Sequence, residues 1–293
     1  MVVAIAVILV AVFAWIVPSQ RKSYSIDALH IQDTVRSDGT LLTVERFSYT
    51  FHGAFTRVYR DIPWDGHQIT VAGVSGPQGP LQRLPSGWTP ASGPPSPIAP
   101  GAEATPSPWT SIAPEERPPG YYRVTTAYAP SLGTVTRIEA FADLRDTSAD
   151  FTFRWTAEGA ADRWKDAGEL EWQLVGRDWT VPMGEVRAVV SLPPGASRAN
   201  VRAWGHGPLN GVLTVRADGS VALSVDDLPP GTFVEVHELF PPDLLSEEDQ
   251  VPIEVVDIRL ATEQGLAAAA TSCVPPPVPR SLGSTASTGP PGR

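Results

Sequence analysis

Short segments of alternating apolar and polar residues recur along most of this chain, and turn-forming residues separate them. In the segment 41–51, LLTVERFSYTF, the alternation places Phe47, Tyr49 and Phe51 on one face of an extended strand. The segment 24–31 alternates with a change of phase that indicates a β-bulge, and the turn SDGT between the two segments predicts a hairpin. Further strand candidates are 68–74, 121–129, 134–144, 150–159, 169–176, 185–192, 199–205, 211–215, 220–225 and 232–240.

The regular spacing of these segments predicts an all-β fold of one or two antiparallel β-sandwich modules. The first module is expected over 23–182, with a Pro-rich excursion at 76–119. A second β-rich module is expected over 183–245, although its strands could equally complete the first sandwich. The segment 160–167, AADRWKDA, is the short helical interruption expected between strands.

The two ends of the described pattern differ from its β-rich centre. After the last strand, residues 246–270 predict a helical segment. The tail 271–293 has no apolar run and is rich in Pro, Ser and Gly, so it is expected to be disordered.

An uninterrupted apolar segment, VVAIAVILVAVFAWIV, extends from Val2 to Val17. As a helix it would span roughly 24 Å, slightly less than the hydrocarbon core of a bilayer. Residues 1–20 are therefore predicted to be a signal peptide or a transmembrane anchor, with the membrane as partner, and the sequence leaves cleavage open. Arg21 and Lys22 follow directly, and the positive-inside tendency alone would keep the remaining chain in the cytoplasm.

Charge and cysteine content exclude several classes of function. The net charge of −10 repels phosphate backbones, so nucleic acid is not an expected partner. The single cysteine, Cys273, allows neither an internal disulfide bond nor a cysteine-based zinc site.

No sequence motif for catalysis, metal binding or cofactor binding is recognisable. The chain has no GxSxG elbow, Walker loop or dinucleotide fingerprint. Glu169 and Glu171 would share the solvated face of a strand rather than form a catalytic pair. We therefore expect no enzyme, no cofactor and no metal. The histidines are dispersed, without zinc-ligand spacing, at His30, His52, His67, His206 and His237.

The segment 51–64, FHGAFTRVYRDIPW, concentrates aromatic and basic residues and has two interpretations. One is a corner of a β-sheet, in which Asp61 pairs locally with Arg57 or Arg60 and Pro63 ends the strand. The other is an interaction site. Its candidate residues are Arg57, Tyr59, Arg60, Asp61 and Trp64.

The 9 tryptophans suggest a binding module as an alternative function, because exposed aromatic rings of exported β-sandwiches stack on sugars. Trp155, Trp172 and Trp204 are expected to fill the core instead. Trp88 and Trp109 lie in the Pro-rich excursion, where burial is less expected.

Several blocks occur in an order that resembles a known family. SDGTLLTVERFSYTF and FTRVYRDIPW are followed by ELEWQLVGRDWTVPMGEVRAVVSLP, VRAWGHGPLNG and LPPGTFVEVHELFP. Over roughly 23–260 they resemble the extracytoplasmic part of the YciQ-like predicted bacterial membrane proteins, domain of unknown function 2207.

The resemblance implies an amino-terminal signal or anchor, a β-rich body outside the cytoplasm and later membrane helices, and it brings no activity or catalytic residues. A start codon assigned too late would reconcile this placement with Arg21 and Lys22, and a frameshift would explain the Pro-rich tail. We expect a cell-membrane protein with an extracytoplasmic body and a structural or interaction role at the envelope. Partners would be other envelope proteins or cell-wall glycan, and the alternatives are a glycan-binding module and a hydrolase.

Overall fold

The computed structural model describes residues 22–85, 118–247 and 250–272. The chain divides into two units, Met1–Glu254 and Val255–Arg293. The predicted N-terminal helix, Trp88, Trp109 and the tail 273–293 lie outside the described residues. Among the described helices, none is long and apolar enough to cross a membrane.

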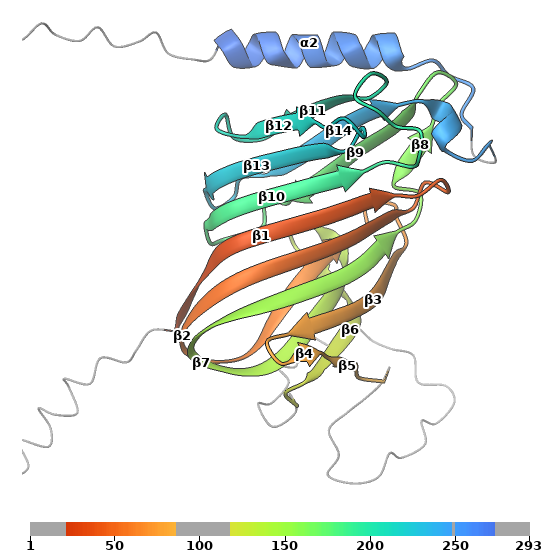
Figure 1. Cartoon of the computed structure of the whole chain (residues 1–293). Coiled ribbons are helices and arrows are strands. Elements are labelled where there is room, and N and C mark those ends of the chain that lie inside the picture. Colours follow the sequence, from red (N-terminus) through yellow and green to blue (C-terminus); the bar gives the residue numbers. More distant parts are fainter. Residues whose placement is uncertain (1–21, 86–117, 248–249, 273–293) are drawn as a thin grey trace, which may run out of the picture. The chain divides into compact units, whose positions relative to one another are not determined.

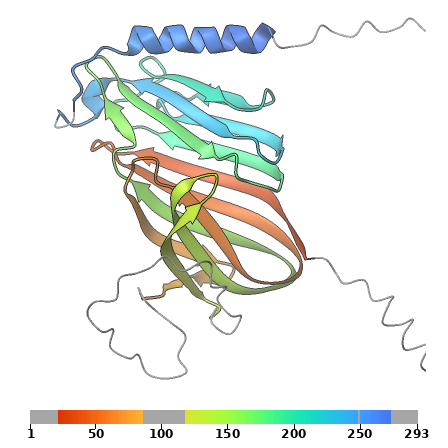
Figure 2. The ribbon, with the colours of Figure 1, turned by 180° about the vertical axis from the view of Figure 1, so that it is seen from behind.

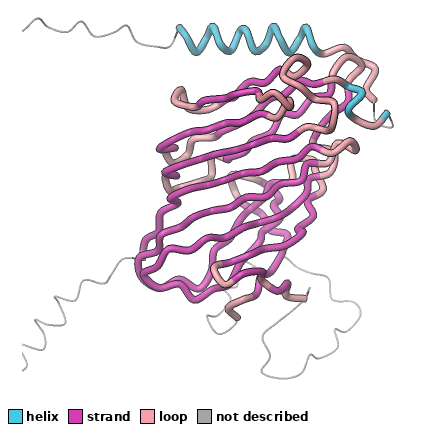
Figure 3. The backbone as a smooth tube through the Cα atoms, in the orientation of Figure 1, coloured by secondary structure: helices cyan, strands magenta, loops and turns pink. Residues whose placement is uncertain are grey.

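The first unit is built from strands (Figures 1 and 3). They are β1 (Ser23–Val35), β2 (Leu41–Pro63), β3 (Ile69–Gly76), β4 (Gly79–Pro80), β5 (Gln82–Arg83), β6 (Tyr121–Ala129), β7 (Gly133–Ala157), β8 (Ala161–Arg163), β9 (Gly168–Val175), β10 (Met183–Ser191), β11 (Arg202–His206), β12 (Val212–Val215), β13 (Val221–Leu228) and β14 (Val234–Phe240). A short 3-10 helix, η2 (Pro242–Leu244), follows.

The strands form two sheets. The larger, sheet A, has ten strands in the order β12-β13-β10-β1-β2-β7-β3-β4, with β6 also paired to β7 and β5 to β6. Sheet B has the order β11-β14-β9-β8. The apolar residues of their facing sides make one hydrophobic core, which includes Phe47, Phe151, Phe153 and Val236.

Sheet A bends along two long paired strands, β2 and β7. β2 and β7 pair antiparallel along almost their whole lengths, from Leu41 opposite Ala157 to Pro63 opposite Val135. Beyond the bend β6 replaces β3 as the other neighbour of β7. Seen from behind, β6, in yellow, lies in front of the part of the sheet that contains β1 and β2 (Figure 2).

The expected hairpin between 24–31 and 41–51 is confirmed. β1 and β2 pair antiparallel, with a register shift between Ile26 and Ala28 where the phase of the sequence changes. The turn is closed by a hydrogen bond from the Arg36 amide to the Thr40 carbonyl, and Gly39 takes φ +76°, a conformation that favours glycine.

The predicted antiparallel sandwich class is wrong, although the fold is largely β. Sheet A is mixed, because β1 pairs parallel with β10, from Ile26 opposite Met183 to Thr34 opposite Ser191. The strands of 183–245 also make no sandwich of their own: β10, β12 and β13 extend sheet A, whereas β11 and β14 belong to sheet B. Alternation and turn residues report strands and hairpins, but they do not report which distant strands become neighbours.

The short helix expected at 160–167 is also wrong. Ala161–Arg163 is strand β8, which forms a hairpin with β9 and pairs Ala161 with Leu170. The Ala161 amide donates to the Gly39 carbonyl, so tertiary contacts override the local helical tendency of an alanine-rich segment. The second unit contains α2 (Val256–Ser272).

Candidate binding cleft

The segment 51–64 is the bend of β2, which confirms the interpretation as a corner. β2 continues through it, with register shifts against β7 between Phe51 and Ala54 and between Phe55 and Arg57. Gly53 adopts φ +87°, and its amide donates to the Asp146 carboxylate at 2.7 Å. The bulges turn the strand and change which side chains face inward.

Asp61 does not pair with Arg57 or Arg60 through its carboxylate, so that prediction is wrong. The Asp61 carboxylate accepts two hydrogen bonds from Arg137 on β7, at 2.6 and 2.5 Å. Arg57 instead pairs with Glu139, which also binds Arg123 of β6. Asp61 lies directly opposite Arg137, and side chains at opposite positions of neighbouring strands share one face, whereas successive side chains of one strand point to opposite faces.

Arg60 points into the protein and forms a buried ion pair. Its guanidinium donates to both carboxylate oxygens of Glu45, at 2.9 and 2.8 Å, and the two side chains are 10% and 2% exposed. The Trp155 indole donates to the same carboxylate at 3.3 Å. Burial opposes the charge on Arg60, but Glu45 and the nearby Asp178 raise its pKa above the ordinary value, so it stays charged.

A cleft of about 380 Å³ lies against this bend. Tyr24, Phe55 and Trp179 give it an aromatic wall, and Trp179 lies 5.8 Å below the Arg60 guanidinium. Tyr59, 54% exposed, lies at the same cleft and is an accessible aromatic ring. The remaining lining residues are Lys22, Tyr49, Phe51, Ala54, Thr56, Arg57, Val58, Arg60, Asp61, Asp178 and Thr180.

Four of the five predicted interaction residues therefore line one cleft. The fifth, Trp64, is not among the lining residues, and its indole donates to the Thr136 hydroxyl at 2.9 Å. Sequence reasoning missed Tyr24, Asp178 and Trp179, which come from β1 and from the loop after β9. No local pattern marks them, because the fold alone brings these segments to the bend.

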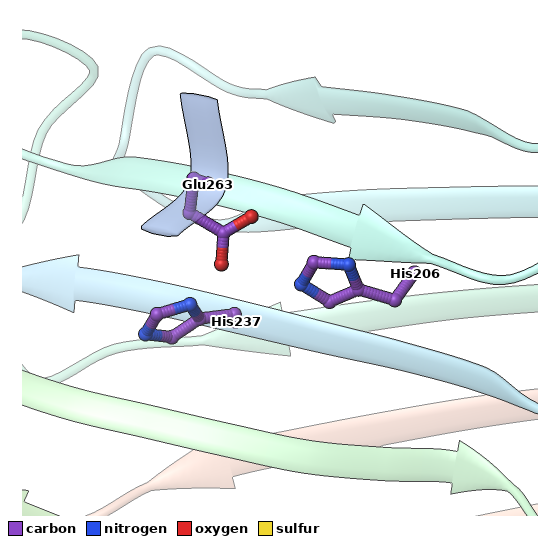
Figure 4. A group of neighbouring side chains, drawn as sticks. All are labelled: His206, His237 and Glu263. Atoms are coloured by element: carbon purple, nitrogen blue, oxygen red, sulfur yellow. The ribbon is translucent and has the colours of Figure 1, made fainter. Parts of the chain in front are cut away.

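The predicted core tryptophans and two of the histidines lie elsewhere. Trp155 is buried, and its ring is 6.2 Å from that of Trp172. His206 and His237 lie on the neighbouring strands β11 and β14 of sheet B (Figure 4). His237 is buried, and its Nε2 lies 2.8 Å from the Glu169 carboxylate. The third residue drawn in Figure 4, Glu263, belongs to α2 in the other unit.

A family model described as "Predicted membrane protein (DUF2207) N-terminal domain" matches residues 25–240. The chain belongs to the DUF2207 family. This confirms the family expected from the sequence blocks, whereas the YciQ-like label within it stays a prediction. The DUF2207 match extends from within β1 to the end of β14, so it includes both sheets and the lining residues of the cleft other than Lys22 and Tyr24. The family is one of predicted membrane proteins.

The curated proteins contain no match to this DUF2207 chain. Among solved structures, it is similar to the M1 zinc metallopeptidase from Deinococcus radiodurans, at 12% identity and TM-score 0.35, covering 74% of this chain and 42% of that one. It is also similar to yeast LTA4 hydrolase in complex with bestatin, at 8% identity and TM-score 0.43, covering 75% and 30%. The chain thus spans less than half of either structure, and likeness at this level carries no inference about activity.

Proposed function

We propose that the β-rich unit is an extracytoplasmic interaction module of a membrane protein, and that the cleft at the bend of β2 is its binding surface. The observation that carries this proposal is the clustering of exposed and half-buried aromatic rings beside cationic groups. Tyr24, Tyr59 and Trp179 offer ring faces, while Arg57 and Lys22 offer charge-assisted donors. The role is one of binding rather than catalysis.

The sequence supports placement next to a membrane. Lys22 lines the cleft. In the sequence it lies only a few residues after Val17, the end of the apolar segment. A chain extends at most roughly 3.5 Å per residue, so an anchor at Val17 would hold the cleft within roughly 20 Å of the bilayer interface. The candidate ligands are segments of other membrane proteins and cell-wall glycan.

Site-specific photocrosslinking tests the cleft as a contact surface. A benzophenone amino acid at Tyr59 of the full chain, expressed in cells, is expected to give a discrete adduct. The matched control is Tyr128, which is 68% exposed on β6 and does not line the cleft. Absence of an adduct at Tyr59, or an equal adduct at both positions, would contradict the proposal.

Cell-wall glycan is the second candidate ligand, and the aromatic wall of the cleft favours it. The crosslinked adduct at Tyr59 distinguishes a protein ligand from a glycan ligand. Muramidase digestion would reduce the mass added by a glycan, whereas it would leave an adduct with another protein intact. If glycan is the ligand, Tyr59→Ala should weaken binding of soluble muropeptides by roughly tenfold, the expected loss of one stacking contact. Tyr128→Ala should leave it unchanged.

A further inference from the structure

A second cavity, of about 330 Å³, adjoins the cleft: Arg60 and Asp178 line both, and Glu45 lines the second cavity. It is bordered by β1, β2 and β7 of sheet A and by β9 and β14 of sheet B, so it opens between the two sheets. We call it the acidic cavity. It belongs entirely to the first unit and is independent of the function proposed for the cleft.

The charge of the acidic cavity is strongly one-sided. Its basic side chains are Arg60, already matched by Glu45, and His67, whose Nδ1 lies 3.2 Å from the Glu158 carbonyl oxygen. Such an excess of carboxylates attracts cations and repels anions. The acidic residues that line it are Asp33, Glu45, Asp65, Glu171, Asp178 and Glu235.

Two buried polar side chains at the cavity have no hydrogen-bond partner of normal geometry among the described residues. Asp33 and Thr43 are each 1% exposed, face each other across β1 and β2, and line the cavity. Neither Asp33 carboxylate oxygen, nor the Thr43 hydroxyl, makes a hydrogen bond of normal geometry. Buried polar groups are usually satisfied, so a missing donor is expected here.

Aromatic rings line the cavity beside these carboxylates. Trp155 and Trp172 contribute indoles whose centroids are 6.2 Å apart, and His67 lies 5.5 Å from the Trp172 ring. The face of an indole attracts a cation and also packs against alkyl groups. Carboxylates together with indole faces are the combination that recognises organic ammonium groups.

We propose that the acidic cavity binds a small organic cation, an alkyl amine whose N–H groups donate to Asp33 and Thr43 while its carbon chain packs against Trp155 and Trp172. The volume favours this ligand over a bare metal ion. A water molecule takes about 30 Å³ of liquid volume, and small-molecule pockets begin at about 300 Å³. A cavity of 330 Å³ therefore accommodates a molecule of several heavy atoms.

Calorimetric titration of the full chain in detergent micelles with cadaverine tests the proposal. Saturable binding of one cadaverine per chain is expected, and its neutral analogue 1,5-pentanediol should bind at least roughly tenfold more weakly, because it lacks the charge. No saturable binding of cadaverine up to millimolar concentration, or equal binding of the diol, would overturn the proposal. Displacement of cadaverine by stoichiometric calcium or magnesium would overturn it in favour of a metal ion.

Single-residue variants test whether cadaverine binds in the acidic cavity. Asp33→Asn should weaken cadaverine binding by at least roughly tenfold. Trp172→Phe keeps an aromatic ring and should weaken cadaverine binding by a few-fold, which tests the aromatic contact separately from the carboxylate. The control is Asp226→Asn, an exposed carboxylate paired with Arg187 and outside the cavity, which should bind as the unmodified chain does. An equal loss in the control would assign the binding to general surface charge and overturn the site.

Discussion

Arg60→Ala is expected to lower the free energy of unfolding by about 3–5 kcal/mol, measured by urea denaturation with tryptophan fluorescence. The substitution leaves Glu45 as a buried carboxylate, 2% exposed, without the guanidinium that neutralises it. The Trp155 indole would remain as its donor.

Arg57→Ala is the matched control. Arg57 is 36% exposed, and its partner Glu139 keeps the ion pair with Arg123, so the expected loss is within about 1 kcal/mol. The double variant Arg60→Met with Glu45→Leu should recover most of the stability, because it removes both buried charges together. A loss for Arg60→Ala no larger than that for Arg57→Ala would show that the buried ion pair does not stabilise the bend.

Asp33→Asn is expected to stabilise the protein at neutral and alkaline pH, in the absence of any cavity ligand. Burial raises the pKa of Asp33 to about 7 from its ordinary 3.8, Thr43 opposes the shift and Glu45 adds to it. Because the folded chain holds this proton more tightly than the unfolded chain, its stability falls as the pH rises from about 4 to about 7. At about 1.4 kcal/mol per pKa unit, the shift from 3.8 to about 7 makes the penalty that Asn removes roughly 4 kcal/mol above pH 7.

The variant and the unmodified chain should therefore agree near pH 4 and diverge toward pH 8. Other charged groups near Asp33 are Glu45 and Arg60 of β2 and Glu238 of β14, whose pKa is raised well above its ordinary value by burial and by Asp33. Glu238 adds to the same trend in both proteins through its burial, and it adds more in the unmodified chain, where Asp33 also raises its pKa. Asp226→Asn, at an exposed site, should shift stability by no more than about 0.5 kcal/mol. Parallel pH profiles for Asp33→Asn and the unmodified chain would contradict the prediction.

Local features of the fold were predictable where neighbours in sequence become neighbours in space. The β1–β2 hairpin and the bulge near Ile26 followed from alternation and its change of phase, and the segment 51–64 was recognised as a corner. The family match also rests on ordered local blocks. In each case the interactions that decide the structure lie within one or two strands.

Long-range features escaped prediction for the opposite reason. The parallel β1–β10 pairing joins residues such as Ile26 and Met183, and nothing in either segment specifies the other. The same holds for the cleft, where Trp179 meets the bend of β2. Local reasoning also assigned the partners of Asp61 and Arg60 to the wrong residues, since Arg137 and Glu45 lie on other strands or another part of β2.

The position of β1 has a mechanical consequence. β1 begins at Ser23, directly after Lys22, and it lies inside sheet A with β10 on one side and β2 on the other. A pull on the chain at Lys22 along the strand would load the hydrogen bonds to both neighbours at once, in shear, instead of peeling an edge strand away one bond at a time. The N-terminal attachment proposed for the β-rich unit would thus place the load on a strand that is held by two neighbours rather than on an edge strand.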